Sequence, residues 1–373
     1  MSTAKRSRQR LVVKVGSGLL RDPQGGLREE IVVNIVHQLS TLRQRGKEVL
    51  LVSSGAIALG IQALGQRRVP QAIAQQQAAA AIGQSHLIWT YERLFSTYGQ
   101  RVAQILLTLD DLHARDRYLN ARNTLQTLLD YGVIPIINEN DTVSVAEIRF
   151  GDNDRLAAMV CHLIDADLLV ILTDLDGLYT ADPRLDPTAE LIPIVEHIDA
   201  RIEALAGRTT QRTGRGGMAS KIQAAKIAGV SGIHTHIANG LRPNVLLQLL
   251  AGDSVGTHIH PPLSVKLPSR KRWIGFALKA KGDIVVDDGA KRALTTRGTS
   301  LLPSGILTVS GNFRFGDAVY CTDTAATRFA QGLVNYSAKE LQVIIGQHTS
   351  RIEQILGHKA YDEVIHRDNL VLL

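Results

Sequence analysis

Short apolar runs that alternate with longer segments of helical periodicity constrain the fold of this chain more than any other feature. Apolar residues run almost unbroken through Leu11–Gly16, Val49–Ser53 and Leu168–Thr173, as is typical of strands that are buried on both faces. Between the first two runs, Leu27–Arg45 carries apolar residues at the spacing of a helix. Because such strands need helices on both faces, we expect an α/β fold, a three-layer αβα sandwich with a mainly parallel sheet. The other elements predicted in this part are helices at Ala72–Tyr98, Ala114–Tyr131, Asp154–Ile164, Ala219–Ala228 and Val245–Ala251, and strands at Val102–Thr108, Val133–Ile137, Gly232–Ala238 and Val255–Ile259.

The pattern changes after Pro261 and Pro262, so the chain is predicted to hold two domains. With 373 residues, of which 45% are hydrophobic, it can bury two cores and is not a disordered chain. We divide it into a basic N-terminal arm at 1–10, an α/β domain at 11–262, a linker at 263–279 and a small mostly-β domain at 280–373. Strands of the last domain are predicted at Asp283–Val286, Leu301–Leu302, Gly305–Ser310, Asp317–Tyr320 and Leu333–Tyr336.

Composition narrows the class of protein further. The net charge is +7, and residues 263–373 supply most of it, with 15 Lys and Arg against 10 Asp and Glu, a net of +5. A basic domain allows a polyanionic partner such as RNA. The apolar runs are far shorter than the roughly 20 residues that a membrane span needs. Cys161 and Cys321 are too few and too far apart for a disulfide framework or a zinc cluster. We therefore expect a soluble cytoplasmic protein.

The candidate binding and catalytic residues lie where the predicted strands end. Lys14 lies inside an apolar strand and is followed at once by Gly16. A buried lysine is costly unless it meets an anion, and a glycine turn presents backbone N–H groups to one. The alternative is a lysine that extends to solvent from an edge strand. The next strand ends at Ser54 and Gly55, in a small-residue turn that opens a helix and can bind a carboxylate or a phosphate.

Two further segments pair amide with carboxylate side chains. Asn138 and Asp141 follow a strand, and Asn153 and Asp154 come after Phe150 and Gly151. Neither segment has the spacing of a metal cage. Helix caps and turns would explain them, but two such segments beside apolar runs favour substrate contacts. Thr173 and Asp174 end another strand.

A glycine-rich segment, Thr213 to Lys221, leads into a helix that carries Lys221. It matches neither the P-loop spacing nor the dinucleotide-binding fingerprint. A loop that cradles an anion and an ordinary surface loop are both compatible with it. Its candidate binding residues are Arg215, Gly216, Gly217, Met218, Ala219, Ser220 and Lys221.

The histidines form two pairs that alternate along predicted strands, His234 with His236 and His258 with His260. No third ligand is in view for either pair, which favours partly exposed histidines over zinc. We predict no metal that is held by protein side chains alone.

Two lysines, several glycine turns and Asn/Asp pairs without an evident general base fit phosphoryl transfer to an acceptor that is already an anion. A carboxylate with a pKa near ~4.3 is almost fully ionised at neutral pH and needs no base. This anion and a polyphosphate repel each other. Fixed cations, Mg²⁺ and backbone N–H donors lower this repulsion.

Six motifs in this order resemble those of the amino acid kinase family, in its glutamate-phosphorylating branch. A second set resembles a PUA domain: Gly282–Ala290, Arg297 with Gly298, Ser300–Pro303, and Gly316 with Asp317. The kinase motifs are Val13–Ser17, Ser53–Ile57, Ile137–Asp141, Gly151–Asp154, Thr173–Asp174 with Gly177–Pro183, and Gly216–Met218 with Lys221.

The resemblance implies ATP- and Mg²⁺-dependent phosphorylation of the side-chain carboxylate of L-glutamate to L-glutamyl 5-phosphate, the first step of proline biosynthesis. It implies that Lys14 and Lys221 hold the phosphoryl group and that Asp154 orients them. Glutamate would be bound by Ser54, Gly55, Asn138, Asp141 and Asn153, and the nucleotide by Lys14, Gly16, Thr173, Asp174 and residues 215–221.

The resemblance also implies feedback inhibition by proline, a homo-oligomer (dimer or tetramer) and a glutamyl phosphate reductase as partner. Kinases of the same family that act on acetylglutamate, aspartate or carbamate remain an alternative, and so does an RNA-binding protein. The C-terminal part has few aromatic residues for stacking on bases, so we expect RNA affinity that is weak or absent at physiological salt, and no membrane partner.

Overall fold

The chain forms two compact units, Met1–Lys266 and Leu267–Leu373, hereafter the N-terminal and the C-terminal unit. The computed structural model describes residues 8–22, 26–66, 68–144, 153–208, 217–262, 271, 274–275, 278–359 and 361–373. Most of the predicted N-terminal arm and most of the predicted linker lie outside these residues.

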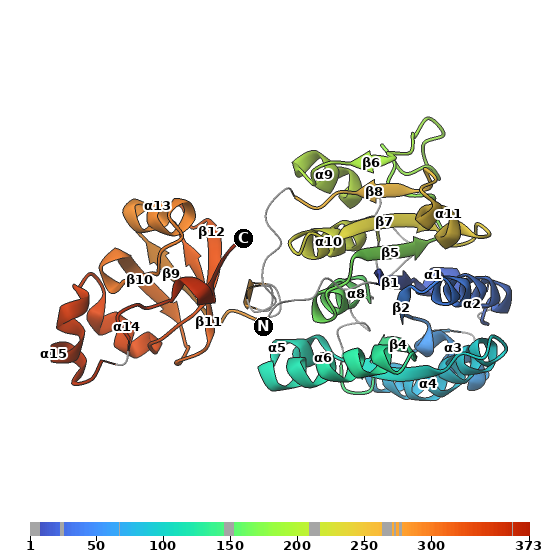
Figure 1. Ribbon diagram of the computed structural model, residues 1–373, viewed down its shortest axis with the longest axis horizontal. Coiled ribbons are helices and arrows are strands. Elements are labelled where there is room, and N and C mark those ends of the chain that lie inside the picture. Colours follow the sequence, from blue (N-terminus) through green and yellow to red (C-terminus); the bar gives the residue numbers. More distant parts are fainter. Residues whose placement is uncertain are drawn as a thin grey trace. The chain divides into compact units, whose positions relative to one another are not determined.

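The N-terminal unit is built on an eight-stranded sheet with the strand order β3-β4-β2-β1-β5-β7-β8-β6 (Figure 1). Its central strands are parallel, whereas β8 runs antiparallel to β7. The mainly parallel α/β sheet predicted from the sequence is therefore confirmed. The strands are β1 Arg10–Val15, β2 Glu48–Val52, β3 Val102–Leu107, β4 Ile134–Glu139, β5 Leu168–Thr173, β6 Ile194–Val195, β7 His234–Asn239 and β8 Thr257–Ile259.

Helices cover both faces of this sheet. On one face, alternate residues of the central strands, among them Val13, Leu51 and Val170, form a core with α2, α4 and α11. On the other face, α8 and α10 contact the central strands. The helices are α1 Ser17–Leu20, α2 Glu29–Gln44, α3 Ala56–Ala63, α4 Ile73–Ser96, α5 Leu109–His113, α6 Arg115–Asp130, α8 Asn153–Leu163, α9 Ala200–Arg208, α10 Met218–Gly229 and α11 Val245–Ala251.

Helices α3 and α4 pack backbone to backbone through two glycines. A Cβ atom on Gly60 would lie 1.7 Å from the carbonyl oxygen of Ala79, and one on Gly83 would lie 1.8 Å from that of Ala56. No side chain fits in either place, because such distances are far inside van der Waals contact. The two glycines thus fix α4 against the helix that follows Ser54, and this contact places Gln84, the next residue of α4, close to the ends of the strands.

The C-terminal unit contains a five-stranded sheet with the order β10-β9-β11-β12-β13. Its strands are β9 Gly282–Val286, β10 Ile306–Gly311, β11 Ala318–Thr322, β12 Arg328–Leu333 and β13 Leu370–Leu372, and its helices are α13 Asp288–Thr296, α14 Ala338–Ile344 and α15 Ile352–Leu356. Ile284, Val319 and Leu341 lie in its separate core.

Two of the predicted strands in this unit are wrong. Leu333–Tyr336 is not a strand, because β12 ends at Leu333 and Ser337 then starts α14 with a capping box to Glu340. At Leu301–Leu302, only Leu301 pairs, in an isolated bridge with Ile365. The unit is a small sheet with helices.

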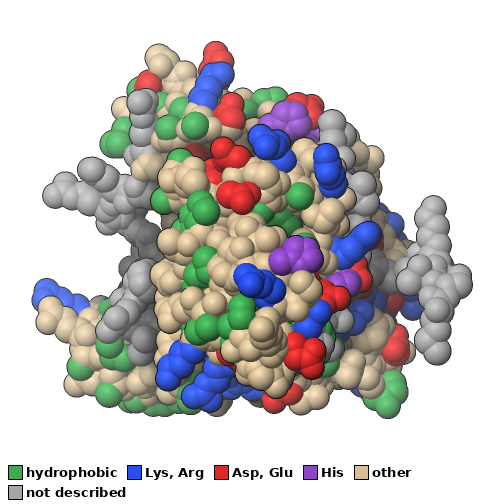
Figure 2. Space-filling view, turned by 90° about the vertical axis from the view of Figure 1, so that its left-hand side faces the viewer, with side chains coloured by type: hydrophobic (Ala, Val, Ile, Leu, Met, Phe, Trp, Pro, Cys, Tyr) green, Lys and Arg blue, Asp and Glu red, His purple; other side chains and the backbone are tan. Residues whose placement is uncertain are grey.

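Charges on the face of the molecule shown in Figure 2 are mixed in sign. Figure 2 shows lysine and arginine side chains that lie singly or in small groups among acidic and neutral ones. In the C-terminal unit, Lys281 pairs with Asp317 at 2.7 Å and Arg328 with Asp283 at 2.9 Å. Among the described helices, none combines the length and the apolar character that crossing a bilayer requires.

Candidate active site

One buried carboxylate holds two lysines that come from distant parts of the N-terminal unit. Asp154, in the first turn of α8, lies 2.6 Å from the Nζ of Lys14 on β1 through Oδ1. Its Oδ2 lies 3.2 Å from the Nζ of Lys221 on α10. The side chains are 0% exposed for Asp154, 4% for Lys14 and 7% for Lys221. At this burial an unpaired charge would cost several kcal/mol, so each ammonium depends on the carboxylate.

The electrostatics of this cluster favour an anion. Burial raises the pKa of Asp154, but the ammonium groups of Lys14 and Lys221 outweigh burial and hold the pKa well below its ordinary value of 3.8. The hydroxyl of Ser220 also donates to Oδ2, at 2.7 Å. Two ammoniums and one ionised carboxylate leave a net charge of +1, which suits a phosphoryl group.

A second polar cluster is centred on the neighbouring residue, Asn153. Its Nδ2 lies 2.7 Å from the carbonyl oxygen of Ser53, 3.0 Å from the Oγ of Ser54 and 2.8 Å from the Oδ1 of Asn138. The amide of Asn138 in turn donates to the Oε1 of Gln84, at 2.8 Å. Because Asn153 and Asp154 are consecutive, the start of α8 joins the amide cluster to the lysine cluster.

The ends of β4, β2, β1 and β5 therefore lie at one edge of the sheet, as the parallel register requires. In β1, Lys14 pairs with Val52 of β2 and with Ile171 of β5, and Val52 pairs with Ile137 of β4. Ser54 and Asn138 thus lie just beyond the same level as the lysine. Parallel α/β sheets bind ligands at this edge.

The predicted nucleotide-binding residues flank the lysine cluster. Gly16 lies next to β5 and donates its N–H to Leu172 at 3.4 Å, and a Cβ atom on it would lie 3.8 Å from the Nζ of Lys14. Thr173 ends β5 and donates to the Oδ1 of the exposed Asp174 at 3.1 Å. The helix α10 begins with Met218, Ala219 and Ser220, after Gly217 as its N-cap. The rest of the predicted loop, including the candidate binding residues Arg215 and Gly216, lies outside the described residues.

The predicted glutamate-binding residues lie on the other side of Lys14 in the strand order. Gly55 has a left-handed φ of 102° and is the N-cap of α3, a conformation that favours glycine. Asp141 is buried just beyond β4. The structure therefore brings the predicted catalytic and amide residues together.

Sequence reasoning missed two residues of α4 that support this edge. Gln84 contacts Asn138 as described above, and the hydroxyl of the buried Tyr91 lies 3.0 Å from the Oγ of Ser53. Burial raises the pKa of Tyr91 to about 12, although the hydrogen bond to Ser53 lowers it. The two residues are seven positions apart and share a helix face. A polar residue on the otherwise apolar face of this helix is the feature of the sequence that could have indicated them.

The αβα fold and the polar residues at the carboxyl ends of its strands are features of one class of protein, and comparison with known proteins identifies this class. The chain belongs to the amino acid kinase family, since the model of that family matches residues 9–239, and a PUA domain model matches residues 282–356. The resemblance found in the sequence motifs is thus confirmed.

Full-length relatives point to a particular enzyme. The chain is 50% identical over 365 residues to the glutamate 5-kinase of Geobacter sulfurreducens, covering 98% of both chains. It is 50% identical over 364 residues to that of Methylococcus capsulatus, covering 98% of this chain and 97% of the relative, and 48% identical over 364 residues to that of Thermoanaerobacter pseudethanolicus, covering 98% of both. A solved UMP kinase from Bacillus anthracis aligns at 16% identity with a TM-score of 0.46, over 70% of this chain and 100% of that one.

Proposed function

We propose that this chain transfers the terminal phosphoryl group of ATP to the side-chain carboxylate of L-glutamate, which gives L-glutamyl 5-phosphate, the first step of proline biosynthesis. The observation that carries the proposal is the clamp of Lys14 and Lys221 on Asp154 at the sheet edge. Relatives that match over nearly the whole chain carry the name glutamate 5-kinase, which supports this substrate.

The acceptor carboxylate needs no general base. A free glutamate side chain has a pKa near ~4.3, so it is an anion at neutral pH and attacks phosphorus as it stands. Asp154 is unsuited to act as a base, because its low pKa makes it a weak proton acceptor and its oxygens already contact two ammoniums. Its proposed role is to position both lysines.

In this proposal, the lysines lower the repulsion between the glutamate carboxylate and the terminal phosphate of ATP. A lysine ammonium has up to three N–H donors, so one that is held by Asp154 can also bind a phosphate oxygen. A cation held ~4 Å from the developing charge contributes up to ~4 kcal/mol at an effective dielectric constant of ~20, or about three decades in rate. Because both lysines are buried and fixed, little reorganisation is needed during the reaction.

Glutamate and the nucleotide occupy the two sides of the lysines in this proposal. We assign glutamate to Ser54, Gly55, Asn138, Asp141 and Asn153, where buried amides and one carboxylate can bind its α-carboxylate and its ammonium. The nucleotide is assigned to Lys14, Gly16, Thr173, Asp174 and residues 215–221. The start of α10 then supplies backbone N–H groups to the phosphates.

Magnesium fits this edge only as an ion that the polyphosphate carries. The best placed carboxylate, Asp154, already contacts two ammoniums, and the described residues at this edge show no cluster of metal ligands. Mg²⁺ prefers to keep several waters and to bind through substrate phosphates. When bound there, it would neutralise charge on the phosphates. Inhibition by proline, assembly into dimers or tetramers and delivery of the product to a reductase remain predictions of the family resemblance.

The test is incubation of the chain with Mg-ATP and hydroxylamine, which traps an acyl phosphate as a hydroxamate. L-Glutamate, N-acetyl-L-glutamate and L-aspartate are offered separately, and ADP release is measured alongside. We expect hydroxamate and ADP with L-glutamate alone. A stronger signal with either of the other acids would assign the chain to a different specificity in the same family.

A further inference from the structure

Four histidines lie together on one face of the sheet, at the pairing of β7 with β8. Along each strand they occupy alternate positions, and alternate residues of a strand share a face. His236 pairs directly with His258 in the antiparallel register. His260 directly follows β8, and its ring centroid lies 5.5 Å from that of His234. Their neighbours in the strands, Thr235, Ile237, Thr257 and Ile259, are buried.

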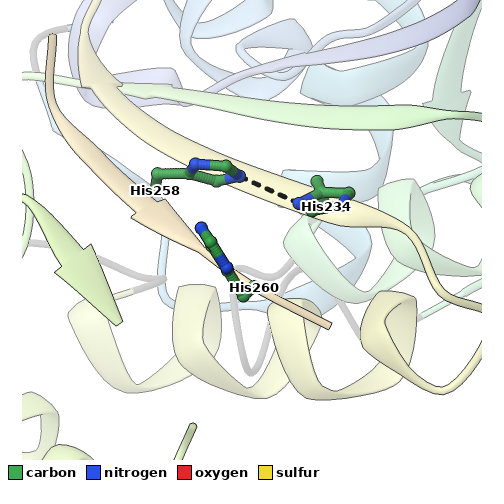
Figure 3. Close-up of side chains that lie close together, drawn as sticks. All are labelled: His234, His258 and His260. Carbon is green, nitrogen blue, oxygen red and sulfur yellow. Dashed lines mark hydrogen bonds between the residues drawn. The ribbon is translucent and has the colours of Figure 1, made fainter. Parts of the chain in front are cut away.

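Three of these side chains converge on one point (Figure 3). The Nδ1 of His234 lies 2.9 Å from the Nε2 of His258. One ring nitrogen each of His234, His258 and His260 can be chosen so that all three nitrogens lie within 4.8 Å of one another. The ring centroids of His258 and His260 are 4.3 Å apart. The sequence shows no third ligand for either histidine pair, but strand pairing brings His234 next to both His258 and His260.

We propose that His234, His258 and His260 bind a divalent transition-metal ion, with Zn²⁺ as the ion that fits best. In a tetrahedral site with Zn–N bonds of about 2.0–2.1 Å, neighbouring ligand nitrogens are roughly 3.3 Å apart. The contact between His234 and His258 would have to open by only about 0.4 Å to reach this spacing. Three imidazoles leave the fourth position to water or another ligand.

The three rings can be reached from solvent. All three are partly exposed, so an ion can enter the site without any rearrangement of the strands.

A carboxylate is placed to orient the third ring. The Oε2 of Glu196 lies 3.0 Å from the Nδ1 of His260, which leaves Nε2 of that ring for a metal. Metal-bound histidines commonly donate their second N–H to such a carboxylate. Glu196 follows β6, whose Val195 pairs with Ile259 of β8. A bound ion would thus tie together β6, β7 and β8 at the end of the sheet.

This site is separate from the kinase site. In β7, His234 pairs with Leu168 at the start of β5, whereas Asn239 pairs with Thr173 at its carboxyl end. Five residues of strand separate the two levels, or about 16 Å. The proposal therefore stands independently of the proposed kinase activity.

The experiment titrates the metal-free full-length chain with ZnCl2 against a chromophoric zinc chelator, without nucleotide. We expect one Zn²⁺ per chain, and a loss of at least about 100-fold in affinity in His258→Gln and in His260→Gln. Glu196→Gln should lose about 10–100-fold, as is typical when a partner of a ligand is removed. The matched control is His86→Gln, which changes an exposed histidine of α4 and should bind zinc like the unmodified chain.

X-ray absorption of the zinc-loaded, unmodified chain provides a measurement that does not depend on how the variants fold. We expect three imidazole nitrogens at about 2.0–2.1 Å. Weak binding of several ions per chain, retention of zinc by His258→Gln and His260→Gln, or a zinc shell without three imidazoles would each overturn the proposal.

Discussion

Two groups of ion pairs, one from each unit, have the same chemistry but very different surroundings. In the N-terminal unit, the side chains of Lys14, Asp154 and Lys221 are 4%, 0% and 7% exposed. In the C-terminal unit, those of Arg328 and Asp283 are 53% and 29% exposed. Exposed pairs contribute little because water screens them, whereas removal of one partner from a buried group leaves an uncompensated charge. Loss of one partner should therefore cost far more stability in the buried cluster than in the exposed pair.

The largest effect is expected from Asp154→Asn. The change leaves two buried ammoniums without their carboxylate, and breaking a buried pair typically costs about 3–5 kcal/mol. The free energy of unfolding, measured with denaturant near pH 7, should fall by about this amount.

The pH dependence of this loss sharpens the test. The pKa of Asp154 is lowered in the native chain. At acidic pH its carboxyl group is therefore protonated in the unfolded chain while it is still ionised in the native chain. The stabilisation is therefore complete above about pH 5 and is lost as the pH falls below about 4. An advantage of the unmodified chain that grows on acidification would contradict this account.

The next effect concerns catalysis. Lys221→Ala should lower kcat at least about 100-fold with little change in the KM for glutamate, because the ammonium acts mainly on the charge of the transition state. The control is Lys226→Ala on the same helix, since Lys226 is exposed and pairs with Glu203 on the surface. Steady-state kinetics of both variants make the comparison, and an unchanged kcat in Lys221→Ala would remove this lysine from the mechanism.

The smallest effect is expected at the exposed pair. Arg328→Ala should change the free energy of unfolding by less than about 1 kcal/mol, and the change should shrink further in high salt. Denaturant unfolding at low and high ionic strength measures it. A loss as large as that of Asp154→Asn would contradict the distinction between the buried cluster and the exposed pair.

Periodicity predicted most helices and strands of the N-terminal unit, because long amphipathic segments and apolar runs leave a strong local signal. The C-terminal unit was predicted less well. Its helices α14 and α15 span only seven and five residues, too short to show a clear helical period. There the capping box of Ser337 and Glu340 decided the structure where a strand had been expected across Leu333–Tyr336.

For the candidate sites, the sequence by itself determined which polar residues stand beside apolar strands and which glycines follow them. Lys14 could be singled out because a lysine inside a buried strand needs a partner. Which partner it has was decided only by the tertiary structure, since Asp154 meets Lys14 and Lys221 through the packing of α8 onto β1 and of α10 onto α8. The histidine cluster was likewise decided by the pairing of β7 with β8. Contacts between distant segments depend on strand order and register, which local sequence does not encode.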